Sequence, residues 1–221
     1  PVERFSSCGA SDWSGCFSDK AERRVGITHE GKLTEATWQL GGLHNLENAL
    51  AAVAAAQSAG VAPAQAVDAL SRFEGVKRRM ERTATVGDIG IYDDFAHHPT
   101  AIGRSIAGLK TRFPGQRVVV ALEPRSNTMK LGVHDDTLAG SLERADLVFV
   151  YRPDDMTPAF DAAMQVLGQR VSIVDDYDAL VDEMASTVGR DDQVVFMSNG
   201  GFGAARQKLT MALQRKQPPP G

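Results

Sequence analysis

The second half of the chain contains short runs of almost uninterrupted apolar residues, each followed by a segment with helical spacing. Val118-Val119-Val120 and Val148-Phe149-Val150 are two such runs. Strands of a parallel sheet are covered on both faces, so they are apolar throughout rather than alternating. Strands of this kind that alternate with helices predict an α/β fold with a doubly wound, Rossmann-like, mainly parallel sheet.

The boundaries of these elements follow from apolar spacing and from the positions of glycine and proline. Ile89 and Ile91 indicate a further strand that ends near Asp93, and Pro99 suits the first turn of the helix that follows. The other strands are expected at residues 117–123, 145–151, 171–174 and 193–197, and the other helices at 135–144, 157–167, 177–188 and 203–214.

The first part of the chain is organised differently. Residues 23–29 and 33–40 alternate in polarity around Glu30-Gly31-Lys32, which predicts an antiparallel hairpin. Helices are expected at about 45–58, closed by Gly60, and from Pro63 to residue 73. Gly75 then begins a charged hinge segment, residues 77–81. We therefore predict two domains, residues 1–78 and 79–221.

Composition excludes some functions. A chain of 221 residues with 43% apolar content can bury an ordinary core. Its net charge of −4 offers no basic surface for nucleic acid, and no apolar run approaches the roughly 20 residues that span a bilayer. We expect a cytoplasmic monomer that binds neither nucleic acid nor membrane.

Four titratable residues lie between the strand at 89–93 and the helix after it: Asp93, Asp94, His97 and His98. In an open α/β sheet, ligands bind at this end of the strands. Capping of the helix by Asp93 or His98 explains one or two of these residues but not all four. A metal-dependent hydrolase with these four ligands is an alternative, although no second His/Asp cluster supplies an opposing face.

Five segments, in order, resemble signatures of the Mur ligases, the ATP-dependent amide-forming enzymes of bacterial peptidoglycan synthesis. They read GLHNLENA at 42–49, KRRME at 77–81, DDFAHHPT at 93–100, EPRSNTMK at 123–130 and SNGGFG at 198–203. The last two are most similar to the branch that joins a murein tripeptide to UDP-N-acetylmuramate during peptidoglycan recycling. The resemblance covers almost the whole chain.

The resemblance implies a Mur ligase carboxyl-terminal domain, preceded by the antiparallel strands and helices that end the central ATPase domain. It also implies ATP and Mg²⁺ as cofactors, UDP-N-acetylmuramate and the tripeptide as substrates, and an acyl-phosphate intermediate. Nucleotide-binding candidates are His44, Asn45, Asn48, Arg79, Asp94 and His97, of which Asn45 has N-capping as its simpler explanation. Substrate-binding candidates are Arg125, Ser126, Asn127, Arg152, Ser198 and Asn199. Lys77 and Arg78 have the simpler interpretation of solvated hinge charges.

The same resemblance raises three further expectations. The family's phosphate-binding loop ends in Gly-Lys-Thr/Ser, whereas the Gly31-Lys32 pair is followed by Leu33. We therefore expect the chain to be a carboxyl-terminal fragment that is inactive alone. We also expect it to carry no catalytic residue and no metal ligand. Arg206 replaces a histidine that the family usually has. The remaining alternatives are a ligase that adds L-alanine to UDP-N-acetylmuramate, which the 123–130 segment argues against, and a non-catalytic peptide-binding module.

Overall fold

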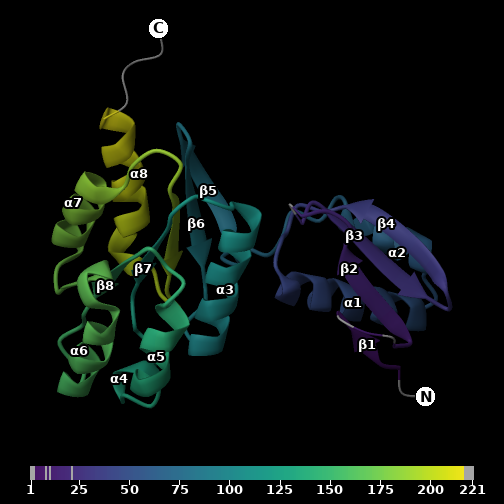
Figure 1. Ribbon diagram of the computed structural model, residues 1–221, viewed down its shortest axis with the longest axis horizontal. Coiled ribbons are helices and arrows are strands. Elements are labelled where there is room, and N and C mark those ends of the chain that lie inside the picture. The colour runs from purple at the N-terminus through teal and green to yellow at the C-terminus, as the bar shows by residue number, and fades with distance from the viewer. Residues whose placement is uncertain (1–2, 8, 10, 21, 217–221) are drawn as a thin grey trace, which may run out of the picture. The chain divides into compact units, whose positions relative to one another are not determined.

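A computed structural model of the chain describes residues 3–7, 9, 11–20 and 22–216. The chain divides into two compact units (Figure 1). Unit 1 comprises Pro1–Gly75 with Ala107–Pro114, and unit 2 comprises Val76–Ile106 with Gly115–Gly221. The segment Pro218–Gly221, whose three prolines predict that it is not helical, lies outside the described residues. The two-domain division at residues 78 and 79 stays a prediction.

Unit 1 is a four-stranded sheet with two helices. Its strands are β1 (Phe5–Ser6), β2 (Trp13–Phe17), β3 (Arg24–His29) and β4 (Lys32–Thr37), and its helices are α1 (Leu43–Ser58) and α2 (Pro63–Leu70). The expected hairpin is β3 and β4, which turn at Glu30 and Gly31, both with positive φ. Leu46, Leu50 and Val53 of α1 are buried against this sheet, as their spacing predicts.

Unit 2 contains a six-stranded sheet in the order β5-β6-β10-β7-β8-β9. Five strands are parallel, and β5 pairs antiparallel with β6 at one edge. The sheet is therefore mixed but mostly parallel, and the α/β expectation is confirmed. The strands are β5 (Glu81–Val86), β6 (Ile89–Asp94), β7 (Val118–Leu122), β8 (Leu147–Tyr151), β9 (Val171–Val174) and β10 (Gln193–Met197).

Helices cover both faces of this sheet (Figure 1). On one face, α7 (Tyr177–Thr187) and α8 (Ala205–Lys216) pack on alternate residues of the strands, such as Ile91, Val119 and Val194. The strand residues between these, including Val118 and Val120, are equally buried on the face where α3 (Pro99–Arg112) and α5 (Asp135–Leu142) lie. Burial on both faces explains the uninterrupted apolar runs.

The remaining elements are short. They are α4 (Asn127–Lys130), α6 (Pro158–Met164) and the 3₁₀ helices η1 (Gln165–Arg170) and η2 (Phe202–Ala204). We did not expect β1, β2, β5 or α4. Strand β5 was not predicted from the sequence. Its residues Arg82, Thr83 and Thr85 are exposed, and an exposed edge strand carries little apolar pattern.

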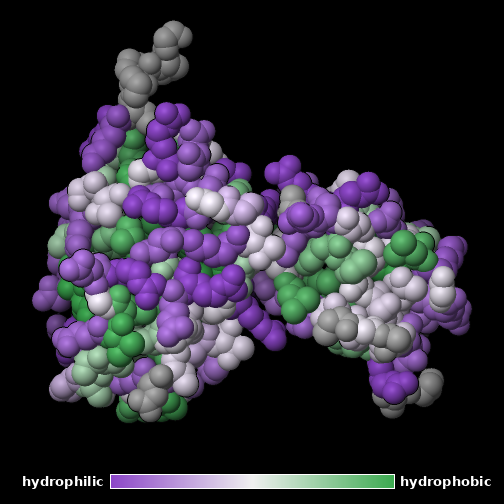
Figure 2. Space-filling model, viewed as in Figure 1, coloured by the Kyte–Doolittle hydropathy of each residue, from purple (hydrophilic) through white to green (hydrophobic). Residues whose placement is uncertain are grey.

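One face of the molecule carries polar and apolar areas side by side (Figure 2). A broad hydrophilic area crosses the middle of the face of unit 2 seen in Figure 2. Within the described part of the chain, no helix combines the length and the apolar character needed to cross a membrane.

Candidate functional site

The carboxyl ends of three neighbouring strands lie level with one another. Met197, the last residue of β10, pairs with Asp94 of β6 and with Leu122 of β7. The Ser198 amide donates to the Asp94 carbonyl at 3.1 Å, and the Glu123 amide donates to the Met197 carbonyl at 3.0 Å. The loops after these strands therefore start from one edge of the sheet, which is where ligands bind in open α/β folds.

Two of these loops border a cavity of 420 Å³. Its lining residues are Arg125, Ser126, Asn127, Asn199, Gly200 and Gly201. Four of the six predicted substrate-binding residues therefore meet at one hollow, although they come from the loops after β7 and β10. We call this hollow the edge pocket.

Arg125 is the cation of the edge pocket. Its side chain is exposed and makes no ion pair with any residue that the structure describes. The guanidinium lies across Gly200, where an added Cβ would come within 2.6 Å of Arg125 Nη1. A planar guanidinium without a protein partner is suited to bidentate binding of a carboxylate.

Asn199 supplies an acceptor next to that cation. Its Oδ1 is buried, yet it lacks a hydrogen-bond partner among the residues that the structure describes. A buried polar atom without a partner is unfavourable in an empty protein, so it favours a ligand or water that donates to it. The edge pocket thus offers a donor for an anion and an acceptor for an N–H or O–H group.

Ser126 and Asn127 begin the short helix α4. Ser126 is the N-cap residue, and its Oγ accepts from the Met129 amide at 3.3 Å, while the Asn127 side chain is exposed. The Ser126 hydroxyl is therefore partly engaged in ordering the loop, whereas the Asn127 amide is accessible.

Ser198 lies beneath the pocket rather than in its lining. It is 2% exposed, and its hydroxyl donates to Glu123 Oε2 and accepts from the Gly200 amide at 2.8 Å. Tyr177 donates its hydroxyl to the other Glu123 oxygen at 2.5 Å. The buried Glu123 carboxylate thereby joins the loops after β7 and β10 to the start of α7.

Tyr177 is held by this arrangement. Its ring stacks on Tyr151 at 3.8 Å between centroids, and burial, followed by the hydrogen bond to Glu123, raises the pKa of its hydroxyl above the usual value. Because the phenol stays neutral at physiological pH, it remains a donor to Glu123.

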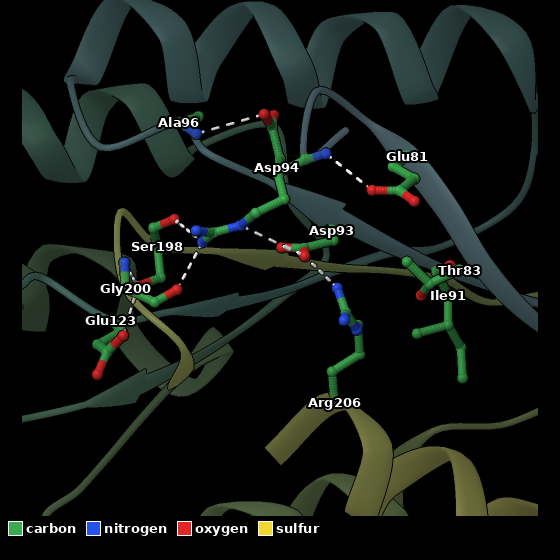
Figure 3. A network of polar contacts seen from close by, with 11 residues as sticks. Glu81, Thr83, Ile91, Asp93, Asp94, Ala96, Glu123, Ser198, Gly200 and Arg206 are labelled. Atoms are coloured by element: carbon green, nitrogen blue, oxygen red, sulfur yellow. Dashed lines mark hydrogen bonds and ion pairs between the residues drawn. The ribbon is translucent and has the colours of Figure 1, made fainter. Parts of the chain in front are cut away.

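A second network lies beside the first (Figure 3). Asp93 Oδ2 faces Arg78 Nε at 3.5 Å and forms an ion pair with Arg206 Nη1. Arg78 Nη2 also donates to the carbonyl oxygens of Ser198 and Gly200, at 2.7 and 2.5 Å. The side chain of Arg78 is only 28% exposed, so its interpretation as a solvated hinge charge was wrong.

The predicted nucleotide residues of unit 2 differ in accessibility. Arg79 is exposed and lies 5.3 Å from the Phe95 ring centroid, so its guanidinium is accessible to phosphate. His97 is half-buried, with Nδ1 2.8 Å from the Phe95 carbonyl. Asp94 is 3% exposed and accepts from Ser105 Oγ at 2.5 Å and from the Ala96 amide at 3.3 Å. Its carboxylate faces the protein rather than the sheet edge.

The other nucleotide candidates lie in unit 1, on the first turns of α1. His44 and Asn45 are half-buried and Asn48 is exposed. Asn45 is not the N-cap residue, because α1 begins at Leu43 with Gly42 as its cap, and Asn45 Nδ2 donates instead to the Gly41 carbonyl at 2.8 Å. Nucleotide binding by these three residues stays a prediction.

Arg152 is not brought to the edge pocket. Its Nε donates to both oxygens of Asp161, at 2.8 and 3.1 Å, and it is not among the lining residues. The structure therefore gives Arg152 an ion pair that fixes the loop after β8 to α6, and substrate binding by Arg152 lacks support from this geometry.

The four residues of the alternative metal site do not converge. Asp93 is paired with two arginines, Asp94 faces Ser105, and His98 Nδ1 accepts from the Thr100 amide at 3.2 Å as a helix cap would. Among the residues described, no group of three or more His, Cys, Asp or Glu side chains is placed to hold a metal ion. Capping is thus confirmed for His98, whereas Asp93 has a different role.

Sequence reasoning did not assign roles to Glu123, Tyr177 or Arg206. One signal was available for Glu123, because a carboxylate directly after five apolar strand residues is expected to be buried and therefore to need partners. No such signal exists for Arg206, which lies more than a hundred residues from Asp93 in the sequence.

Comparison with known proteins identifies a family that this chain matches. The family model "Mur ligase, glutamate ligase domain" matches residues 78–200. The UDP-N-acetylmuramate–L-alanyl-gamma-D-glutamyl-meso-2,6-diaminoheptandioate ligase of Escherichia coli (strain K12) is 42% identical over 200 residues, which are 90% of this chain and 44% of that protein. The UDP-N-acetylmuramate–L-alanine ligase of Burkholderia multivorans is 32% identical over 98% of this chain and 50% of its own length.

A solved structure has a similar fold. A murein peptide ligase from Psychrobacter arcticus 273-4 superimposes with a TM-score of 0.71 and 35% identity, covering 99% of this chain and 48% of that one. The chain thus spans about half the length of the relatives it matches.

Proposed function

The chain belongs to the Mur ligase family, and from this premise we propose that it supplies the tripeptide-binding part of an ATP-dependent ligase. The complete reaction joins L-alanyl-γ-D-glutamyl-meso-diaminopimelate to UDP-N-acetylmuramate by a new C–N bond. The observation that carries the proposal is the Arg125 guanidinium at the edge pocket, which has no ion pair with any described residue. The name of the relative that is 42% identical supports the same substrates.

The chemistry of the tripeptide suits the edge pocket. This peptide carries several carboxylates, and one of them can accept two parallel hydrogen bonds from Arg125. The diaminopimelate residue also carries an ammonium group, which can donate to Asn199 Oδ1, the buried acceptor that lacks a partner. Asn127 and Ser126 complete the polar lining. In this proposal, Ser198 shapes the pocket floor and does not contact the ligand.

We propose that ATP with Mg²⁺ binds to the same ligase and that Arg79 approaches its phosphates. Arg79 fits this role because its guanidinium is exposed and has no ion pair within the described part of the chain. His97, His44, Asn45 and Asn48 remain candidates for the nucleoside. The Asp94 carboxylate is turned inward and accepts a hydrogen bond from Ser105. To bind the ribose, it would have to replace this hydrogen bond by bonds from the ribose hydroxyls.

The bound nucleotide would supply the phosphoryl group that activates the lactyl carboxylate of UDP-N-acetylmuramate. Phosphoryl transfer depends on positioning and on neutralising charge, and Arg79 can contribute to both. Arg125 and Asn199 would hold the incoming peptide, so that its amine is presented in one orientation.

The rival within the family is the ligase that uses L-alanine as the incoming amine. The relatives that are 32% identical over 98% of the chain carry that name. The cavity of 420 Å³ is large for a single alanine. The Arg125 side chain and Asn199 Oδ1 have no partner among the described residues, which suits a longer ligand with several charged groups. The edge pocket therefore favours the tripeptide.

Calorimetric titration of the chain with three ligands tests the proposal. We expect saturable binding of the tripeptide, weaker binding of the dipeptide L-alanyl-γ-D-glutamate by about 10-fold or more, and no measurable binding of L-alanine. Equal affinity for tripeptide and dipeptide would refute the assignment of the edge pocket to the diaminopimelate end. Saturable binding of L-alanine in its place would favour the rival.

Two further expectations belong to this proposal. The 221 residues contain no Gly-Lys-Thr/Ser loop, so we expect the chain alone to catalyse no ATP-dependent ligation. We also propose that the ligase acts as a cytoplasmic monomer, which analytical ultracentrifugation of the purified chain and cell fractionation would test.

A further inference from the structure

Arg78 contacts two backbone carbonyls of the same turn. One nitrogen, Nη2, donates to the Ser198 carbonyl at 2.7 Å and to the Gly200 carbonyl at 2.5 Å. These carbonyls lie on either side of Asn199, the pocket residue whose Oδ1 is unpartnered. We call residues 198–201 the pocket turn. A single guanidinium nitrogen thereby bridges the pocket turn from beneath.

The orientation of Arg78 is itself fixed by other contacts. Its Nε faces Asp93 Oδ2 at 3.5 Å, its guanidinium lies 5.2 Å from the Phe95 ring centroid, and its amide donates to Glu81 at 2.8 Å. Asp93 is held in turn by Arg206 from α8. Figure 3 shows Asp93 between Arg206 and the pocket turn at Ser198 and Gly200. The guanidinium therefore has little freedom to rotate away from the turn.

The other restraints on the pocket turn act mainly at its first residue. The Ser198 amide donates to the Asp94 carbonyl and the Ser198 hydroxyl donates to Glu123, while the Gly200 amide donates to Ser198 Oγ at 2.8 Å. A Cβ added at Gly201 would meet no atom within 4 Å, so neighbouring side chains do not pack closely there. Two adjacent glycines lose much conformational freedom on folding, so an ordered turn needs compensating interactions. Among the described side chains, Arg78 is the one that donates hydrogen bonds to the backbone carbonyls of this turn.

We propose that Arg78 is a positioning residue for tripeptide binding, because it holds the pocket turn in the conformation that presents Asn199 to the ligand. Asp93 and Arg206 act through Arg78 by fixing its guanidinium plane. This inference rests on the proposed function for the ligand, but the ordering of the turn can be measured without any ligand.

Arginine is required for this geometry. Its planar fork presents Nε to Asp93 and Nη2 to the two carbonyls at the same time. A lysine at this position has one ammonium group, which cannot occupy both places. Arg78 also lies in the hinge segment at 77–81, three residues after Gly75, so the order of the pocket turn depends on the backbone of that segment.

The test compares Arg78→Ala and Arg78→Lys with a matched control, Arg82→Ala. Arg82 lies on β5, is exposed, and makes no side-chain hydrogen bond or ion pair with the described residues. Amide hydrogen exchange by NMR is measured at Gly200, with the amides of 194–196 in β10 as an internal reference for global opening. Calorimetry then gives the dissociation constant for L-alanyl-γ-D-glutamyl-meso-diaminopimelate.

We expect both Arg78 variants to accelerate exchange at Gly200 by about 10-fold or more and to weaken tripeptide binding by a similar factor. Exchange within β10 and all properties of Arg82→Ala should match the wild-type chain. Arg78→Lys keeps the charge and the aliphatic stem, so it should remain folded if Arg78→Ala does not.

Two results would overturn the proposal. Exchange at Gly200 in the Arg78 variants could equal that in Arg82→Ala, which would mean that Arg78 does not order the turn. Exchange could also rise while tripeptide affinity stays unchanged, which would mean that the order of the turn does not affect the ligand. If the wild-type chain bound no tripeptide, the proposed function would fail, and the exchange comparison would still decide whether Arg78 holds the turn.

Discussion

The polar side chains at the two edges of the sheet in unit 2 differ in their hydrogen-bond and ion-pair partners. At the amino edge, Asp192 accepts two bonds from Arg117, at 2.8 and 2.6 Å, and one from the Gly189 amide at 2.8 Å. Gln193 accepts from Tyr92 and donates to Gln116. At the carboxyl edge, Arg125 has no ion pair among the described residues and Asn199 Oδ1 has no hydrogen-bond partner there.

This difference predicts that the amino edge contributes to the stability of the fold and that the carboxyl edge contributes to ligand binding. Buried polar groups that are satisfied within the protein stabilise the fold, whereas polar groups that lack a partner remain available to a ligand. Substitutions at the amino edge should therefore reduce stability without changing affinity. Substitutions in the edge pocket should reduce affinity without changing stability.

The largest expected effect is at the amino edge. Asp192→Ala removes three hydrogen bonds from an almost fully buried carboxylate and leaves the half-exposed Arg117 unpaired. We expect the free energy of unfolding to fall by about 2–3 kcal/mol, with tripeptide affinity unchanged. Urea denaturation and calorimetry measure the two quantities. Asp192→Asn keeps the shape of the side chain and some of its hydrogen bonds, so its free energy of unfolding should fall by less. A fall below about 0.5 kcal/mol for Asp192→Ala would contradict the comparison of the two edges.

The next effect is at the edge pocket. Arg125→Ala removes a charge-assisted contact to the ligand, so tripeptide affinity should fall by about 1.5–3 kcal/mol, or roughly 10- to 150-fold. The melting temperature should not change, because Arg125 has no ion pair with the described residues. Arg190→Ala removes an exposed arginine that pairs with Asp88 and is the matched control. A lower melting temperature with unchanged affinity would make Arg125 a loop anchor instead.

A third prediction concerns pH. Burial and the hydrogen bond to Glu123 raise the pKa of Tyr177 above its usual value of 10.0. The resulting stabilisation is complete below about pH 10 and is lost as the pH rises through that value toward the higher pKa of the folded state. Tyr177→Phe should cost about 1–1.5 kcal/mol at neutral pH, and this deficit should shrink above about pH 10.

Urea denaturation of the wild-type chain and of Tyr177→Phe between pH 7 and about pH 11 measures that deficit. A deficit that stays constant across the alkaline range would show that Tyr177 ionises at the same pH in the folded and unfolded states.

The smallest effect is at Gly200. An added Cβ would come within 2.6 Å of Arg125 Nη1, and the flexible end of Arg125 can move to relieve that contact. Gly200→Ala should thus leave stability within about 0.5 kcal/mol and weaken tripeptide binding by less than Arg125→Ala does. Gly140→Ala is the control, since Gly140 lies on α5 outside the lining of the edge pocket and its Cβ would meet no atom within 4 Å. Equal affinities for the two glycine variants would show that the position of Arg125 does not matter.

The sequence was sufficient for the five parallel strands of the sheet, because burial on both faces leaves an apolar pattern within each strand. Strands β9 and β10 begin and end where their apolar runs predict, and Pro99 begins α3. Asp176 caps α7 by accepting from the Ala179 amide at 2.8 Å, at the helix start that the sequence predicts. Strand β5 was not predicted, because an exposed edge strand leaves almost no apolar pattern.

The candidate site was predicted only in part. Arg125, Ser126, Asn127 and Asn199 were selected by the resemblance to family motifs. Each also lies in a loop after a predicted strand, and the carboxyl ends of parallel strands share one edge. The sequence could not show which of the polar loop residues would form hydrogen bonds or ion pairs with other residues of the chain. Arg152 is paired with Asp161, Asp94 with Ser105, and Ser198 with Glu123.

By itself, the sequence determined the α/β architecture and the family, because both depend on local patterns of apolar and motif residues. Tertiary structure alone decided which charges are free, because pairing depends on residues that are distant in sequence and close in space. Arg78 and Arg125 both follow a turn or strand end and look alike in the sequence. Folding surrounds Arg78 with Asp93 and two carbonyl oxygens, and it leaves Arg125 available to a ligand.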